Sequence, residues 1–542
     1  MGREIQISPE FIQRIEQLNT IGISLSAERD SAYLLEKILL GAKSITNADG
    51  GTLYVMDEQR QLRFEIMRTD SLDIALGGSS GKKISLEPIA LYNQKGEPNI
   101  KTVAAFAAIK GETVNIPDIY QASGFDFSGT KRYDEQTGYQ SKSFLTVPML
   151  NHEREVIGVL QLINARDRIT GETVGFCYED QRLTQSLASQ AAVALSNQFL
   201  LQDVKGLLEK FIEVIASAID EKSPYTGGHC RRVPLIAMLI AEAIHEVDCG
   251  PLEAAKFSDA QFYELRIAAL LHDCGKITTP VHIVDKATKL EAIYDRMQHV
   301  DLRFELMKRD VEMSYLKERL RRLEGKPLEV DSVVTDKIAC LTEQQDFLHH
   351  CNLGSEHMPV EAQQKIAQIA RQHWQYNDEQ HPLLSEEEIY HLSIVKGTLT
   401  PEERAVINNH IVRSIKMLES LPFPKHLQNV PEIAGGHHER MDGKGYPRGL
   451  TRNQMSLQAR LMGIADIFEA LTAGDRPYKK AMTLSQALRI MGQMKLDHHI
   501  DPDIFDVFIH QQVYLKYAEQ FLSAEQIDDI NFDSLPGYQA LE

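Results

Sequence analysis

Apolar residues recur every three or four positions through the first 45 residues, for example at Ile12, Ile15 and Leu18, and this spacing predicts helices. From about residue 50 the apolar positions become consecutive or alternating, which predicts β-strands. Helical spacing returns in a long segment at about 178–220. The first 200 residues are therefore predicted to form an α+β domain that is entered and left by helices. The predicted strands cover residues 51–56, 62–66, 144–149 and 156–164.

The rest of the chain, from about residue 205, is helical in pattern almost throughout. Residues 291–396 differ from their surroundings, because apolar positions at helical spacing lie among many Arg, Lys and Glu residues. A second apolar-periodic arm follows at about 333–373, and turn-forming residues at 325–327 separate the two arms. This pattern predicts an antiparallel helical hairpin inserted into a helical domain. Two ordinary core helices fit the short, imperfect repeats equally well.

A chain of 542 residues exceeds one ordinary core, and its length is typical of about three domains of ~150 residues. The predicted fold class is multidomain, with an α+β sensor-like domain followed by an all-α domain that carries the helical-hairpin insertion. The predicted segments are an N-terminal helix (1–24), the α+β domain (25–200), a linker helix (201–224), the all-α domain (225–290 and 397–520), the insertion (291–396) and a C-terminal tail (521–542).

The composition adds limits on partners and compartment. A hydrophobic fraction of 43% and a charged fraction of 25% are typical of a globular protein. The net charge of -19 argues against nucleic-acid binding, which needs a basic surface, but leaves a small anionic ligand open where metal ions invert the local potential. Six cysteines without CxxC spacing indicate reduced thiols. Because no apolar stretch reaches ~20 residues, the sequence predicts a cytoplasmic protein without a membrane span.

Seven imidazole and carboxylate side chains are candidate metal ligands. The pair His272-Asp273 follows the apolar run 267–271, where an unpaired buried charge would be costly, and Asp466 follows a similar run. Neighbouring side chains on a helix point about 100° apart, so an adjacent histidine pair suits two metals better than one. Imidazole and carboxylate without thiolate suit Fe, Mn, Co or Zn. The candidates are His229, His272, Asp273, His410, His437, His438 and Asp466.

Each histidine can also be interpreted as an ordinary surface or structural residue. A single histidine among 19 is far more often a surface or capping residue than a ligand, and His229 or His410 alone would be dismissed. Two other adjacent pairs, at 349–350 and 498–499, lack acids and glycines at matching offsets, and we interpret them as solvated or structural. His299 is a competing third histidine, but the segment that ends at His410 is the better match to the family described next.

The run His-His-Glu-Arg-Met-Asp-Gly-Lys-Gly-Tyr-Pro at 437–447, together with Gly275-Lys276, resembles the HD-GYP family of metal-dependent cyclic di-GMP phosphodiesterases. The resemblance implies hydrolysis to the linear dinucleotide or on to GMP, with Asp273 bridging two ions and Lys276 contacting phosphate as the second catalytic residue. Family members with three metals carry Glu where this chain has Tyr225, so two ions are expected, Fe or Mn first, with Zn, Co, Ni or Mg as alternatives. The implied substrate-binding residues are Lys276, Asp442, Gly443, Gly445, Tyr446, Pro447 and Arg476.

Residues 25–200 resemble a GAF domain of the cyclic-nucleotide-binding kind, on the basis of Asn164, Phe176 and Asp180. Ala165 and Gln181 replace the Lys and Glu of that pattern, which removes a charged pair. The resemblances together imply a small molecule or cyclic nucleotide bound at the GAF domain, regulation of the catalytic domain, a homodimer, and a diguanylate cyclase partner at the Gly-Tyr-Pro loop. Another cyclic dinucleotide or nucleotide substrate, or a non-catalytic nucleotide-sensing scaffold, remains an alternative.

Overall fold

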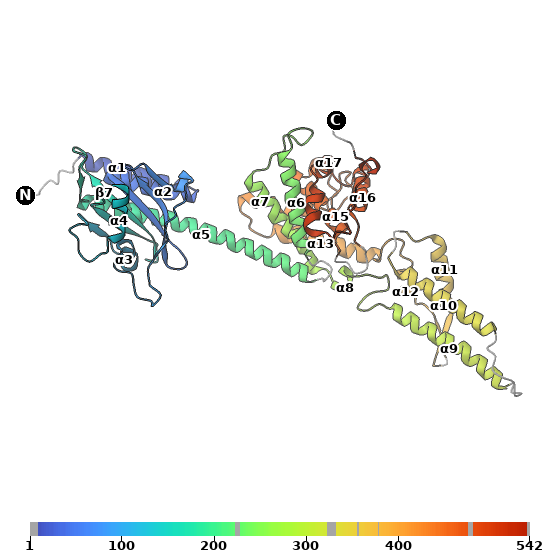
Figure 1. The fold of residues 1–542 in the computed structure, drawn as a ribbon. Helices are drawn as coiled ribbons and strands as arrows, with labels where there is room; N and C mark the ends of the chain where they lie inside the picture. The colour runs from blue at the N-terminus through green and yellow to red at the C-terminus, as the bar shows by residue number, and fades with distance from the viewer. Residues whose placement is uncertain are drawn as a thin grey trace, which may run out of the picture. The chain divides into compact units, whose positions relative to one another are not determined.

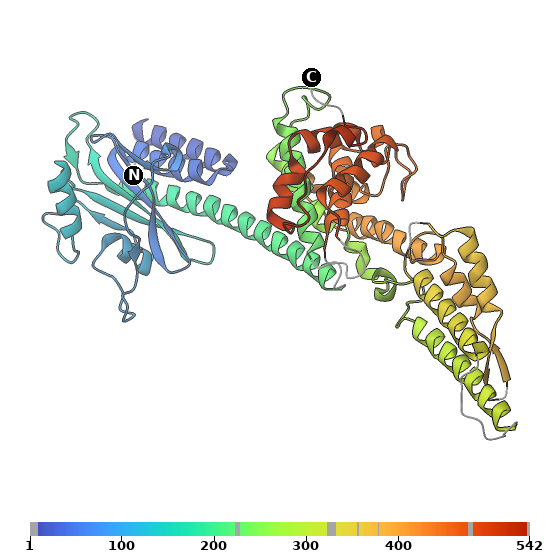
Figure 2. The same ribbon diagram turned by 45° about the vertical axis from the view of Figure 1, so that its right-hand side comes forward.

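The computed structural model describes residues 9–222, 228–321, 332–354, 357–377, 379–474 and 481–538. The chain divides into two compact units, Met1–Leu208 and Glu209–Glu542. Figures 1 and 2 show the elements of each unit, coloured along the chain. In the described residues, no helix is long and apolar enough to cross a membrane.

The first unit is built on an antiparallel sheet of strand order β3-β2-β1-β7-β6-β5, with β4 paired to β2 and β8 to β7. Strands β1 and β7 lie at its centre, and most of their residues are buried. The strands are β1 (Ala48–Met56), β2 (Gln61–Thr69), β3 (Ile74–Gly77), β4 (Ile89–Ala90), β5 (Val114–Ile116), β6 (Phe144–Leu150), β7 (Val156–Arg166) and β8 (Thr173–Val174).

Helices cover both faces of this sheet. Helix α2 packs on β1, and its N-terminus is capped by Asp30, which accepts hydrogen bonds from two backbone N–H groups. Helices α1, α2 and the first part of α5 share one apolar core with the sheet, while α3 packs on β6 and β7. The helices are α1 (Pro9–Ala27), α2 (Ser31–Thr46), α3 (Val103–Lys110), α4 (Ser128–Thr137) and α5 (Tyr178–Lys222). The α+β prediction for this part of the chain is confirmed.

Helix α5 is continuous from Tyr178 to Lys222, so the structure has no break at the predicted boundary between residues 200 and 201. Its first part contributes Leu187 and Leu195 to the core of the first unit. In its last part, Ile212 and Ile219 are buried in the second unit. One helix therefore belongs to both units.

The second unit is a helical bundle around α6, which packs against α7, α15, α17 and α18. The helix starts follow from local sequence. Ser258 caps the N-terminus of α7 and Thr400 caps that of α13, each in a capping box. The helices are α6 (His229–Glu246), α7 (Asp259–Leu271), α8 (Val281–Val284), α13 (Pro401–Glu419), α14 (Val430–Gly435), α15 (Leu457–Thr472), α16 (Leu484–Leu496), α17 (Pro502–His510) and α18 (Val513–Phe521), with the short 3-10 helices η2 (Cys274–Thr278), η3 (Lys425–Leu427), η4 (Arg452–Gln454) and η5 (Phe532–Ser534).

The predicted insertion contains two long helices that pack on each other, and it has an apolar cluster of its own. It also contains a two-stranded β-hairpin that the sequence analysis did not anticipate, because its strands are four residues long and polar. At its base, the fully buried Lys289 donates hydrogen bonds to the carbonyls of Leu392 (3.2 Å) and Ile394 (2.8 Å). The elements are α9 (Met297–Arg321), α10 (Ser332–Asn352), α11 (Val360–Ala370), β9 (His373–Tyr376), β10 (Glu379–Pro382) and α12 (Glu386–Leu392).

Candidate metal centre

Five helices of the second unit bring the seven candidate ligands to one place. The ligands sit at helix ends or on buried helix faces, where the backbone fixes their direction. The first residue of α6 is His229, the end of α7 supplies His272 and Asp273, α13 carries His410, the turn after α14 carries His437 and His438, and α15 carries Asp466. The histidine pair therefore follows a helix rather than lying on one. All seven are buried or largely buried.

One group of ligand atoms forms around His229, His272 and Asp273. The Nε2 atoms of His229 and His272 are 3.2 Å apart, and each lies 3.1–3.2 Å from Asp273 Oδ2. Asp466 Oδ1 lies 3.4 Å from His229 Nε2. Ligand atoms that share one ion at bonds of ~2.0–2.2 Å lie roughly 3.0–3.5 Å apart. These spacings therefore fit a single divalent ion without rearrangement of the ligands.

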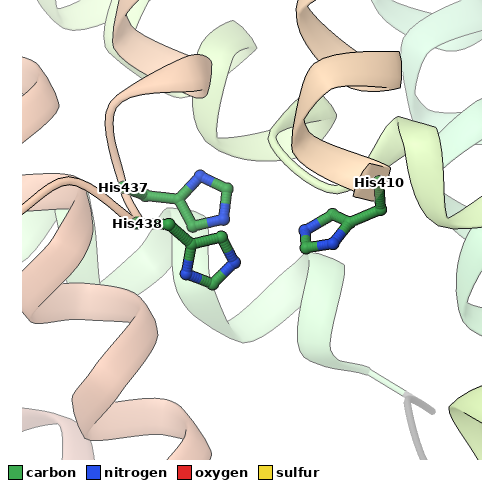
Figure 3. Close-up of side chains that lie close together, drawn as sticks. All are labelled: His410, His437 and His438. Atoms are coloured by element: carbon green, nitrogen blue, oxygen red, sulfur yellow. The ribbon is translucent and has the colours of Figure 1, made fainter. Parts of the chain in front are cut away.

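A second group consists of His410, His437 and His438. Figure 3 shows the rings of His437 and His438 side by side on the segment that follows α14, and the ring of His410 across from them on α13. The ring centroids of His437 and His438 are 4.2 Å apart, and those of His410 and His438 are 5.2 Å apart. The structure thus places the adjacent pair in the same group, whereas the helical argument from sequence assigned one ring to each metal.

Asp273 joins the two groups. Its Oδ2 atom faces His229 and His272, and its Oδ1 atom lies 3.2 Å from His410 Nε2. Asp273 Oδ1 and His410 Nε2 are buried and have no hydrogen-bond partner in the described structure. Burying such atoms unsatisfied is costly, and metal coordination would satisfy both. The donor set therefore fits two divalent ions bridged by one carboxylate.

The other ring nitrogen of four of these histidines is held in place, which directs Nε2 towards the cluster. Such anchoring fixes the tautomer and the ring orientation of a metal ligand. The Nδ1 atoms of three histidines lie within hydrogen-bond distance of a carbonyl three residues earlier in the chain, and that of the fourth faces a carboxylate. The pairs are His272–Ala269 (2.8 Å), His410–Ile407 (2.6 Å), His437–Ala434 (2.6 Å) and His229–Glu469 Oε2 (2.6 Å).

The electrostatics of the cluster favour neutral rings on one side and a cation on the other. Burial, together with nearby histidines, lowers the pKa of His437 far below its usual range and that of His438 to about 4. Burial also acts to lower the pKa of His229, but hydrogen bonds to Asp273 and Glu469 outweigh it and raise that pKa to about 10. The carboxylates that stabilise a protonated His229 would equally stabilise a divalent ion beside it.

Two glycines allow the backbone to approach closely enough to build the site. A Cβ atom on Gly275 would lie 2.0 Å from the carbonyl oxygen of His410 and 2.6 Å from Ser414 N. A Cβ atom on Gly445 would lie 2.4 Å from Arg440 N. Real Cβ atoms do not approach backbone this closely. The absence of a side chain at Gly275 therefore lets Asp273 reach His410.

Comparisons with known proteins agree with this architecture. Residues 33–195 match the GAF domain family, and residues 226–346 and 385–504 match HD domain families. The chain carries a GAF domain followed by an HD domain. The HD matches contain all seven clustered ligands, and the finding is consistent with the resemblance to the HD-GYP family.

Three relatives from Vibrio cholerae serotype O1 show the range of similarity. The chain is 26% identical over 325 residues (60% of this chain, 42% of the relative) to "3'3'-cGAMP-specific phosphodiesterase 3". It is 40% identical over 136 residues (24% and 30%) to "3'3'-cGAMP-specific phosphodiesterase 1" and 37% identical over 135 residues (24% and 30%) to "Probable cyclic di-GMP phosphodiesterase". The matched parts span less than half the length of these relatives.

The Gly-Tyr-Pro loop of the HD domain lies against the second histidine group. The ring of Tyr446 stacks on that of His438, with centroids 4.8 Å apart and planes 19° apart. Asp442 pairs with Arg440 and accepts a hydrogen bond from Lys444 N, so it holds the turn in shape. Gly443 has a φ of 77°, a left-handed conformation that favours glycine. Pro447 follows Tyr446 through a cis peptide bond.

Lys276 lies on η2 next to the cluster. Its Nζ atom is 2.5 Å from Asp273 Oδ2. Burial acts to lower the pKa of Lys276, but Asp273 and Asp466 outweigh it and raise that pKa, so the side chain is an ammonium at neutral pH. Two other predicted positions, Tyr225 and Arg476, lie outside the described residues.

The sequence analysis missed two buried glutamates that support the site. Glu469 orients His229 and is itself paired with Arg232 at 2.7 Å. Glu439 accepts hydrogen bonds from the backbone of Arg448 (2.7 Å) and Leu450 (2.9 Å), which fixes the far side of the Gly-Tyr-Pro loop. A usable signal for Glu469 was its position, because a residue three positions after Asp466 lies on the same helix face.

The three residues predicted to bind a ligand in the GAF domain have structural partners. Asn164 accepts hydrogen bonds from Lys142 N (2.7 Å) and Ser143 N (3.2 Å). Phe176 is buried in the core of the unit. Asp180 accepts a hydrogen bond from Cys177 N at the start of α5 and pairs with Arg14. Their role in ligand binding stays a prediction. The six cysteines, all in described segments, are free thiols.

Proposed function

We propose that this chain is a metal-dependent phosphodiesterase that hydrolyses a cyclic dinucleotide, with cyclic di-GMP as the first candidate and the linear dinucleotide or GMP as product. One observation carries the proposal. Asp273 presents one carboxylate oxygen to each of two groups of buried, oriented histidines. This arrangement suits two divalent ions, and the ligand set favours Fe or Mn, with Zn, Co, Ni or Mg as alternatives. The names of the relatives support the same reaction class.

When bound, two such ions would polarise a phosphodiester and bring the pKa of water towards neutrality. The residues of the chain supply the remaining functions. Lys276 offers a partly buried ammonium beside Asp273, where it can donate a hydrogen bond to a phosphate oxygen as negative charge develops. The ring of Tyr446 forms a flat wall over His438, against which a base or ribose can pack. Glu469 keeps the His229 ring in the orientation that presents Nε2.

A second candidate substrate is 3'3'-cyclic GMP-AMP. Two of the relatives described above are named as specific for it, while a third is named for cyclic di-GMP. The two cyclic dinucleotides share the phosphodiester ring that the metal cluster and Lys276 would engage, and they differ only in one base. The base must therefore be read by residues outside the metal centre, and the clustered ligands support both substrates equally.

Regulation by the GAF domain also belongs to this proposal. The support is the continuity of α5, which leaves the GAF core and ends at Lys222, whose Nζ donates to the carbonyls of Lys276, Ile277 and Thr279. A shift at the end of α5 would therefore reach the segment that carries the proposed catalytic lysine. Binding of a small molecule or cyclic nucleotide at the GAF domain, and of a diguanylate cyclase at the Gly-Tyr-Pro loop, remain predictions.

The test compares hydrolysis of cyclic di-GMP, 3'3'-cyclic GMP-AMP and 3',5'-cyclic GMP by full-length protein purified without oxygen, with metal content measured on the same sample. We expect about two ions per chain and turnover of at least one cyclic dinucleotide. Replacing both His437 and His438 by Ala should abolish turnover and lower the metal content. The matched control is the same double change at the exposed pair His349 and His350, which should leave both unchanged. Fully loaded protein that hydrolyses none of the three substrates would contradict the proposal.

A further inference from the structure

The insertion at 291–396 contains an open cavity that is lined by its own residues. The cavity has a volume of about 380 Å³ and lies between α9, α10 and the β9–β10 hairpin. Helices α9 and α10 pack side by side (Figure 1). Sites for small molecules have volumes on the order of 300–1,000 Å³. None of the seven candidate metal ligands comes from this insertion, so the metal centre does not explain the cavity.

Part of the cavity lining is apolar and aromatic. Met307, Val311 and Leu341 line the cavity, and they belong to the apolar cluster of the insertion or pack against it. Trp374 also lines the cavity. Its ring centroid lies 5.6 Å from that of His381 and 5.9 Å from that of Tyr376. These neighbours restrict the indole, so a flat ligand that stacks on it immobilises little additional side chain.

Four glutamines line the same cavity. Gln372 Nε2 donates a hydrogen bond to Gln344 Oε1 (2.7 Å), and Gln375 and Gln380 occupy opposite positions on β9 and β10. A glutamine amide has one acceptor oxygen and two donor hydrogens. The bond between Gln344 and Gln372 therefore uses only part of the hydrogen-bonding capacity of these two amides. The cavity combines apolar surface with several neighbouring donors and acceptors.

The charges and polarity of the lining narrow the class of ligand. Lys337 and Asp310 supply one positive and one negative charge, and both residues are exposed. A ligand with several negative charges, such as a nucleoside triphosphate, would find no excess of positive charge here. An aliphatic ligand would take the amides out of water without pairing them. A flat, uncharged heterocycle with its own donors and acceptors satisfies both parts of the lining.

We propose that this cavity binds a purine nucleoside, with the base stacked on Trp374 and its polar edge hydrogen-bonded by the glutamine amides. Bases stack on aromatic side chains, and a glutamine amide pairs with N6 and N7 of adenine. A purine has two fused rings and therefore stacks over a larger area than a pyrimidine does. The insertion is then a binding module for a nucleoside. This role goes beyond the proposed hydrolysis and does not rest on it.

The first experiment measures tryptophan fluorescence of the full-length chain. Trp374 is the only tryptophan in the sequence, so this signal comes from the cavity itself. Titration with adenosine or guanosine should quench the emission and reach saturation, with a Kd on the order of 10–100 µM. Cytidine should bind at least about tenfold more weakly, because its single ring loses stacking area.

Variants test the role of the amides. Replacing both Gln375 and Gln380 by Ala should raise the Kd for adenosine about tenfold or more, since it removes hydrogen bonds to the base. The matched control is the same double change at Gln364 and Gln368, which are exposed on α11 and do not line the cavity. An unchanged emission spectrum without ligand shows that the hairpin still forms. Gln344→Met, on α10, should also weaken binding and leaves the hairpin sequence intact.

An exposed thiol gives a second readout. Cys340 lines the cavity, so bound adenosine should slow its alkylation, whereas the exposed Cys249, outside the insertion, should react at an unchanged rate. The proposal is overturned if neither purine nucleoside gives saturable quenching, or if cytidine binds as tightly as adenosine. It is also overturned if Cys340 is not protected, or if the affinity survives both glutamine variants. Neither measurement involves metal or hydrolysis, so the proposed function is judged separately.

Discussion

Replacing Gly275 by Ala should uncouple the two halves of the metal cluster without removing a single ligand. The added Cβ would lie 2.0 Å from the carbonyl oxygen of His410 and 2.6 and 2.8 Å from the N and Oγ atoms of Ser414. Two of these three atoms are backbone atoms of α13, so no side-chain rotation relieves the clash. To restore an ordinary separation of ~3.4 Å from the His410 carbonyl oxygen, η2 and α13 must move apart by roughly 1.4 Å.

That movement would separate Asp273 from His410, the contact that joins the two groups of ligands. Asp273 is two residues before Gly275, and its Oδ1 atom lies 3.2 Å from His410 Nε2. A functional metal site tolerates deviations in ligand distance of only about ±0.2 Å, so a shift of ~1.4 Å prevents one carboxylate from serving both groups. We expect the metal content to fall and kcat/KM to decrease by about 100-fold. Overpacking of this kind costs about 1–3 kcal/mol, which lowers Tm by roughly 2–12 °C.

The assay measures metal content, kcat/KM for the cyclic dinucleotide that is turned over, and Tm on one preparation. The control is Gly129→Ala, because a Cβ at Gly129 meets no atom within 4 Å and the position is far from the cluster in sequence. If Gly275→Ala retains wild-type metal content and rate, the close approach of η2 to α13 does not build the site, and the bridging role assigned to Asp273 is wrong.

Three further predictions follow from buried contacts of the second unit. Glu469→Gln removes the anionic partner of His229 Nδ1, so metal affinity measured by chelator competition should fall about 10–100-fold. Tyr446→Ala removes the ring stacked on His438 and should raise KM more than it lowers metal content, whereas Tyr446→Phe should behave as the wild type. Burial lowers the pKa of Lys289 from 10.5 to about 8, so the folded state holds its charged form at a cost of about 3 kcal/mol below pH 8. This cost shrinks as pH rises from 8 to 10.5. The Tm of the wild type should therefore rise relative to the Tm of Lys289→Met over that range.

Each of these predictions has a control and an outcome that contradicts it. Glu388→Gln changes a buried glutamate of the insertion, paired with Arg303, and should leave metal affinity unchanged. An equal loss in both glutamate variants would show that global destabilisation, rather than ring orientation, is the cause. A KM unaffected by loss of the Tyr446 ring would remove it from the substrate site. A Tm difference for Lys289→Met that is constant with pH would mean that Lys289 is charged in the folded protein throughout.

The sequence predicted the fold class, for physical reasons that act locally. Alternating apolar strands and helical periods separated the α+β part from the helical part, because burial imposes those periods on any chain that folds this way. The ligand types could be named because His272-Asp273 and Asp466 each follow an apolar run, where a charge needs a partner. Exposed histidine pairs elsewhere lacked that context, and His349 and His350 are indeed on the surface.

What only the tertiary structure decided is which atoms meet. The sequence could not show that Asp273 turns one oxygen to each histidine group, because this depends on the approach of η2 to α13, from residues more than 130 positions apart. The position of Glu469, three residues after Asp466, placed it on the same helix face, but only the tertiary structure showed that its carboxylate contacts His229 Nδ1. Periods are local and can be read along the chain, whereas contacts and exposure depend on how distant segments pack together.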